Sequence, residues 1–93
     1  MAKKTVEFEV KGKDGVQAFW IAVGDQDVRL VNGKGSIQVD DKEPEVLVWW
    51  FTGVSGARLS ITGTVGTRTV VEVKQSEIPK GKKRGAGFRL FEV

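Results

Sequence analysis

The sequence predicts an all-β protein, and three observations lead to that prediction. Short segments recur in which apolar and polar residues alternate, as they do in strands with one buried face. Tight-turn signals such as Asp14-Gly15 and Asn32-Gly33 separate these segments. No window of about 11 residues has a helical period, and the 12 glycines suit frequent turns. We expect one domain over residues 1–93, a small antiparallel β-sandwich of seven to eight short strands rich in hairpins, with a small β-barrel as the alternative.

The first half of the chain supplies four of the expected strands, at residues 4–11, 16–23, 28–31 and 36–39. The first alternates cleanly, with Val6, Phe8 and Val10 predicted to point inward. Residues 40–45 are interpreted as a polar loop, because Pro44 lacks the N–H that a strand interior needs.

The second half supplies the remaining expected strands, at residues 46–52, 58–62, 67–74 and 88–93. Glycine-containing turns separate the first three of them. Residues 75–87 form the longest segment with no strand pattern, and it is expected to be irregular.

Two of the expected strands are apolar on both faces, and a third is mixed. On strand 16–23, Phe19, Ile21 and Val23 oppose Ala18, Trp20 and Ala22, and on strand 46–52, Leu47, Trp49 and Phe51 oppose Val46, Val48 and Trp50. On strand 88–93, Phe88 and Leu90 oppose Phe91 and Val93. Three interpretations stay open for the second face. A loop or the C-terminal segment covers it, or it contacts another protein or a second copy, or it stacks sugar rings or bases.

The basic loop is the segment 80–89, which contains Lys80, Lys82, Lys83, Arg84 and Arg89. These five cations exceed the net charge of +3, so the rest of the chain is slightly acidic. Such a loop could hold a phosphate backbone while a nearby aromatic ring stacks on a base. It could equally be a solvated loop that prevents edge-to-edge pairing of sheets, or it could meet an acidic protein surface or an anionic lipid.

The composition argues against catalysis. The chain has no His, Cys or Tyr, so the most common general base and the thiol nucleophile are both missing. The acidic residues of loops 24–27 and 40–45 fit no metal-binding motif and are interpreted as turn residues. We therefore expect no enzyme activity, no metal site and no cofactor.

The absence of cysteine favours a reducing compartment. The N-terminus has no signal-peptide pattern, and no apolar run approaches the roughly 18 residues of a membrane span. We expect a soluble cytoplasmic protein that does not insert into a membrane.

These observations lead to one functional hypothesis and one alternative. The first is a non-catalytic binding or assembly module, in which Trp20 and either Trp49 or Trp50 make apolar contact with a protein partner or a second copy. Lys82, Lys83 and Arg84 would orient an acidic partner. The alternative is a nucleic-acid-binding barrel that uses the same aromatic and basic residues.

Overall fold

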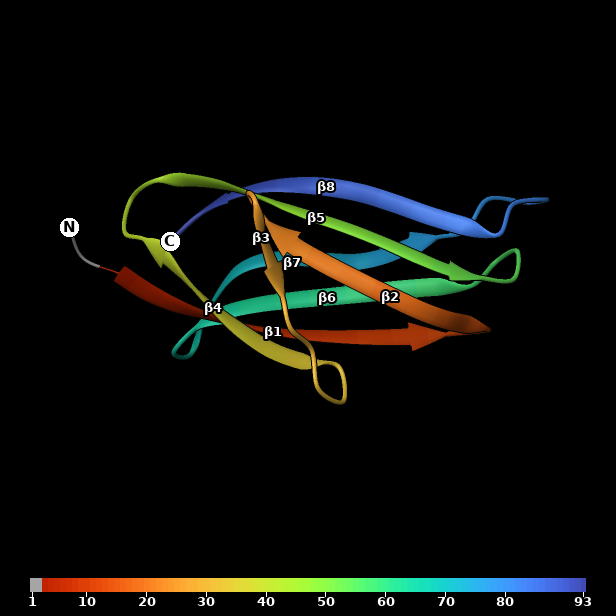
Figure 1. Ribbon diagram of the computed structural model, residues 1–93, viewed down its shortest axis with the longest axis horizontal. Coiled ribbons are helices and arrows are strands. Elements are labelled where there is room, and N and C mark those ends of the chain that lie inside the picture. Colours follow the sequence, from red (N-terminus) through yellow and green to blue (C-terminus); the bar gives the residue numbers. More distant parts are fainter. Residues whose placement is uncertain (1–2) are drawn as a thin grey trace.

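The computed structural model describes residues 3–93 as two antiparallel four-stranded sheets packed face to face (Figure 1). The strand orders are β4-β1-β6-β7, here called the β1 sheet, and β3-β2-β5-β8, here called the β5 sheet. Within these residues the strands are β1 (Lys3–Lys13), β2 (Val16–Val23), β3 (Gln26–Val28), β4 (Lys34–Asp40), β5 (Pro44–Gly53), β6 (Arg58–Val65), β7 (Arg68–Glu77) and β8 (Arg84–Glu92). The two sheets do not close on themselves, so the predicted sandwich is confirmed and the barrel alternative is wrong.

No helix within residues 3–93 is long and apolar enough to cross a membrane.

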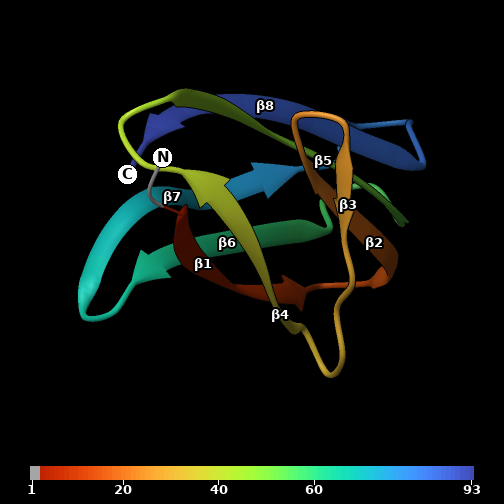
Figure 2. The ribbon, with the colours of Figure 1, turned by 60° about the vertical axis from the view of Figure 1, so that its left-hand side comes forward.

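Both predicted tight turns form, but each connects strands of different sheets. Asp14 and Gly15 have φ values of 61° and 108°, and Asn32 and Gly33 have values of 55° and 78°. Asp14-Gly15 leads from β1 into β2, and Asn32-Gly33 from β3 towards β4, where Figure 2 shows the chain passing between the layers. Among the described strands, only β2–β3 and β6–β7 are neighbours both in sequence and in one sheet. Pairing across Asn32-Gly33 is limited to one antiparallel bridge between Val31 and Lys34, so the positive φ identified both turns but not the pairing of the longer strands beside them.

The core lies between the sheets, on the sides that the alternation predicts. Val6, Phe8 and Val10 of β1 are buried, as expected. The ring of Phe8 meets that of Phe91 edge to face, with centroids 6.5 Å apart and an interplanar angle of 84°. Burial of apolar surface in this layer, at about 25 cal/mol per Å², is the main source of stability.

Two of the predicted loops are shorter than the sequence suggests. Pro44 does not interrupt a strand but begins β5, where it pairs with Glu92. Proline is accepted there because the first residue of a strand need not donate to the ladder. The irregular segment is also shorter than 75–87, because β7 extends to Glu77 and β8 already begins at Arg84.

The glycines of β8 explain why it lacks an apolar pattern. Gly85 and Gly87 point inward, and a Cβ at either would lie within 2.5 Å of the rings of Phe51 or Trp49. These two rings fill the space that side chains on β8 would otherwise occupy. Residues that the sequence suggests to be loop glycines are therefore packing positions in a strand.

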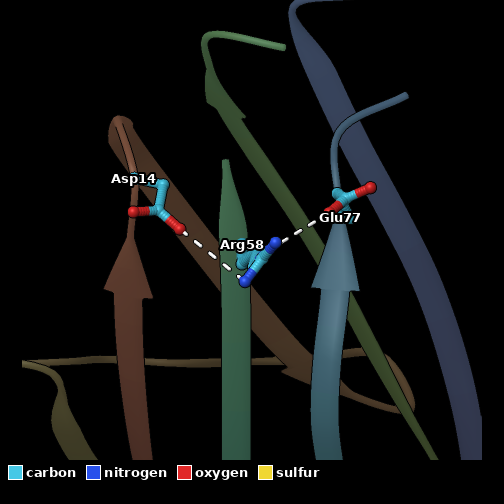
Figure 3. A network of polar contacts seen from close by, with 3 residues as sticks. All are labelled: Asp14, Arg58 and Glu77. Carbon is cyan, nitrogen blue, oxygen red and sulfur yellow. Dashed lines mark hydrogen bonds and ion pairs between the residues drawn. The ribbon is translucent and has the colours of Figure 1, made fainter. Parts of the chain in front are cut away.

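A network of ion pairs connects neighbouring strands at one end of the β1 sheet. Figure 3 shows Arg58 between Asp14 and Glu77. The Arg58 Nε donates to Glu77 Oε1 at 3.2 Å, and Nη1 lies 3.9 Å from Asp14 Oδ2. Since all three side chains are solvent-accessible, the network adds at most about 1 kcal/mol per pair.

Candidate functional site

The outward side of the β5 sheet is apolar across three adjacent strands. Antiparallel pairing aligns its side chains in rows that run across the strands. Trp20, Trp50 and Ala86 form one row, here called the tryptophan row. Ala22, Val48 and Phe88 form the next, here called the phenylalanine row. With the flanking positions on the same strands, the apolar face comprises Ala18, Trp20, Ala22, Val46, Val48, Trp50, Ala86, Phe88 and Leu90.

Two tryptophans stand at the centre of this face. The indoles of Trp20 and Trp50 stack on one another with centroids 6.2 Å apart and an interplanar angle of 16°. Trp20 is 45% exposed and Trp50 is 39% exposed. Each indole therefore covers the other in part and still presents apolar surface to solvent.

The β8 side of the face is more open. Phe88 is 69% exposed and Leu90 is 71% exposed. Strand β8 pairs with β5 at the edge of the same sheet, so it extends the face instead of covering it. Within residues 3–93 the C-terminal segment therefore does not provide the cover that one interpretation of the sequence required.

Trp49 does not belong to this face. It is only 4% exposed, and its Nε1 donates to Ser76 Oγ of β7 at 3.0 Å. Consecutive residues of a strand point to opposite sides, so Trp50 points outward because Trp49 points inward. Of the two tryptophans left open by the sequence, Trp50 lies on the outer surface, and Trp49 is corrected to a core residue.

The predicted cations are divided between two environments. Lys82 and Lys83 lie in the short loop before β8, and Arg84 is the first residue of that strand, at the end of the apolar face. Arg89 is turned away from this face, because its Nη1 donates to the carbonyl of Glu72 on β7 at 2.9 Å. The predicted basic loop is therefore not one continuous surface.

The loop that contains Lys82 is held against the β5–β6 turn. Ser55 Oγ accepts from the Gly81 N–H at 2.9 Å and donates to the Lys82 carbonyl at 3.3 Å. The Gly53 N–H also donates to the Lys83 carbonyl at 3.0 Å. This loop and the turn line an open depression of about 530 Å³ at that end of the molecule. The lysine backbone is thus fixed while the side chains remain exposed.

The acidic residues do not assemble into a metal site in the described part of the chain. No group of three or more Asp and Glu residues between 3 and 93 lies close enough together to hold an ion. Asp27 instead lies beside the tryptophans, where it lines a depression of about 350 Å³ together with Arg29, Trp20 and Trp50.

Sequence reasoning selected the two outward tryptophans but left the β8 part of the face out of the candidate site. Phe88 and Leu90 are the most exposed large apolar side chains on the face. The sequence does indicate this exposure, because a strand at 88–93 with apolar residues on both sides must turn one apolar side outward. The contribution of Ala86 was hidden because the glycines beside it suggested a loop.

Comparisons with protein-family models, with curated proteins and with solved structures found no significant match to this chain.

Proposed function

We propose that this chain is a non-catalytic binding or assembly module that contacts another protein chain, of its own kind or a different one, through the apolar face. The observation that carries the proposal is the continuity of exposed Trp20, Trp50, Phe88 and Leu90 over β2, β5 and β8. Contiguous apolar patches with a polar rim mark contact surfaces in proteins of this size. Aromatic residues are enriched in such surfaces.

In this proposal, the basic residues at one end of the face set the orientation of the partner. Lys82, Lys83 and Arg84 stand beyond the tryptophan row and keep their side chains in solvent. Exposed charges at the rim of an interface mainly raise the association rate and select the orientation of the partner. An acidic segment on the partner would therefore be expected opposite this end.

Site-specific photo-crosslinking tests the proposal. A benzophenone side chain is placed at position 88 in one variant and at Gln38 in the control, because Gln38 is exposed on the outer side of the β1 sheet. Irradiation in cells that express the protein should give protein adducts from position 88 and none from position 38. Adducts of equal yield from both positions, or none from position 88, contradict the proposal.

Single-stranded nucleic acid is the second candidate, and the position of Arg84 favours it. This cation pairs in register with Thr52 at the end of the face that bears Trp20 and Trp50, so phosphate contact and base stacking could occur together. Fluorescence anisotropy of labelled oligonucleotides tests this candidate. Binding should weaken with salt at a log–log slope of roughly −0.7 per phosphate contacted. Loss of binding on replacing Lys82, Lys83 and Arg84 by Ala supports it, and salt-independent binding contradicts it.

A further inference from the structure

The shape of the apolar face shows a regular exchange of large and small side chains between its two rows. Across β2, β5 and β8, the tryptophan row reads large, large, small, as Trp20, Trp50, Ala86. The phenylalanine row reads small, medium, large, as Ala22, Val48, Phe88. On each strand, the larger residue of one row therefore stands beside a smaller residue of the other row.

This exchange makes the face complementary to itself. Consider a twofold axis that lies in the plane of the face, between the two rows and perpendicular to the strands. It places each strand over the same strand of a second copy, running in the opposite direction, and each row over the other row. Trp20 then lies over the position of Ala22 of the copy, which is only 7% exposed, Trp50 meets Val48, and Phe88 meets Ala86. Large side chains fill the space above small ones, which is how well-packed interfaces reach the density of a protein interior.

The charges around the face fit the same axis. On the β3 side, Asp27 extends the phenylalanine row, and Arg29 lies beside Trp20 and Trp50 of the tryptophan row. The axis therefore brings Asp27 of one copy towards Arg29 of the other. On β8 the same rotation places Arg84 opposite Leu90 of the copy, and exposed Glu92 comes to lie two residues further along, at the end that also carries Lys82 and Lys83. An axis along the strands would instead bring each charged end of β8 to the level of its own counterpart.

The available area allows such a pair but predicts that it associates weakly. Seven residues at about 3.3 Å each on β2, β5 and β8, with the three residues of β3 and strands about 4.8 Å apart, give a flat area of roughly 380 Å² per copy. Two copies thus bury roughly 760 Å² before side-chain relief is counted, which is below the 1,000 Å² or so of stable specific interfaces and predicts weak association. The chain also exposes 6093 Å², compared with about 5,300 Å² expected for a monomer of 10.2 kDa.

We infer that the partner of the apolar face is a second copy of this chain, packed sheet to sheet about the twofold axis described above. The inference rests on the proposed function and gives its partner. The product is a four-layered dimer with the β5 sheets in the middle and the polar outer sides of the β1 sheets facing solvent. Twisted sheets pack with their strands within about 30° of each other, which this antiparallel arrangement allows.

Exchange of one large and one small residue on β8 tests the axis. Sedimentation over a dilution series measures the dimer dissociation constant. Ala86→Phe places two large rings opposite each other, and Phe88→Ala leaves a gap, so each should raise the dissociation constant at least about tenfold. The double variant Ala86→Phe/Phe88→Ala restores a large residue opposite a small one and should return the constant towards that of the original chain. Both side chains are exposed, so folding is expected to persist and is checked by circular dichroism.

A mixture of two charge variants tests the same axis without changing the apolar contacts. The variant Asp27→Arg carries two cations at this rim, and Arg29→Asp carries two carboxylates. Native mass spectrometry of the mixture should show the mixed dimer in excess over either pure dimer. A statistical distribution of the three species would overturn the proposed orientation.

The remaining outcomes separate this inference from the proposed function. A dimer that neither β8 substitution weakens uses another surface, and the inference fails. A dimer that both substitutions weaken but the double variant does not restore contradicts the axis. A chain that stays monomeric up to about 1 mM, while position 88 still crosslinks to a different protein, overturns the second copy as partner and leaves the proposed function supported.

Discussion

The outer sides of the two sheets differ although each sheet has four antiparallel strands. On the β1 sheet, side chains such as Glu7, Glu9, Lys34, Thr62 and Thr64 line an open depression of about 550 Å³. On the β5 sheet, the corresponding positions carry the apolar face. A sandwich needs apolar side chains only between its sheets. The fold therefore accounts for the polar side but not for the apolar one, and the difference supports a contact role for the β5 sheet.

The first prediction concerns the two faces of β5 itself. Trp49→Ala should reduce the free energy of unfolding by about 3–5 kcal/mol, because it leaves a cavity in the core and Ser76 without its indole partner. Trp50→Ala should cost at most about half as much, since its side chain is 39% exposed. Urea denaturation of both variants, at concentrations low enough for the monomer, measures the two losses. Equal losses would mean that the outward face also holds the monomer together.

The second prediction makes the same comparison on β8. Gly85→Val places a branched side chain against the ring of Phe51, where a Cβ alone would come within 2.5 Å. The expected loss of stability is about 1–3 kcal/mol. The control Ala86→Val adds bulk on the outward side of the same strand and should change stability by no more than about 0.5 kcal/mol. A mild effect at position 85 would show that Phe51 can move aside, which thermal denaturation of the two variants would reveal.

These glycines also show where sequence reasoning ends. The bounds of β2 follow from the sequence, because Asp14-Gly15 and Gly24 frame a run of apolar residues. The start of β8 does not, because Gly85 and Gly87 leave room for the rings of Phe51 and Trp49, which lie 34 and 38 residues earlier in the chain. A local sequence pattern depends on residues close together in the chain. The residues at the start of β8 are instead determined by side chains that are distant in the chain and adjacent in space.

The candidate site, like the strands, is predicted by the sequence only in part. The doubly apolar pattern of 46–52 predicts that one tryptophan faces outward, but both choices satisfy the alternation. The choice between Trp49 and Trp50 depends on which side of β5 meets the β1 sheet, and long-range contacts such as that of Trp49 with Ser76 show which side it is. The separation of Arg89 from Arg84 likewise follows from the alternation of β8, which the loop interpretation concealed.

The third prediction tests the outer faces directly with an apolar dye. At concentrations that favour the monomer, the variant Phe88→Lys/Leu90→Lys should lose most of the fluorescence of bound 1-anilinonaphthalene-8-sulfonate, because the exposed apolar surface is interrupted. The matched control Thr62→Lys/Thr64→Lys places lysines two residues apart on the β1 sheet and should leave the fluorescence unchanged. Stability should stay within about 0.5 kcal/mol for the first variant. Equal dye binding by both variants would contradict the difference between the faces.

The smallest expected effect concerns the ion pairs of the polar face. Glu9 lies 3.1 Å from the ammonium of Lys11 and 3.9 Å from that of Lys34. All three side chains remain solvent-accessible, so water and salt screen the attraction, and Glu9→Gln should lower the free energy of unfolding by no more than about 0.5 kcal/mol. Urea denaturation at low and at high salt measures this loss, which should shrink further as salt is added. A salt-sensitive loss above about 1 kcal/mol would show that the charges of the β1 sheet, and not only the apolar layer beneath them, hold the fold together.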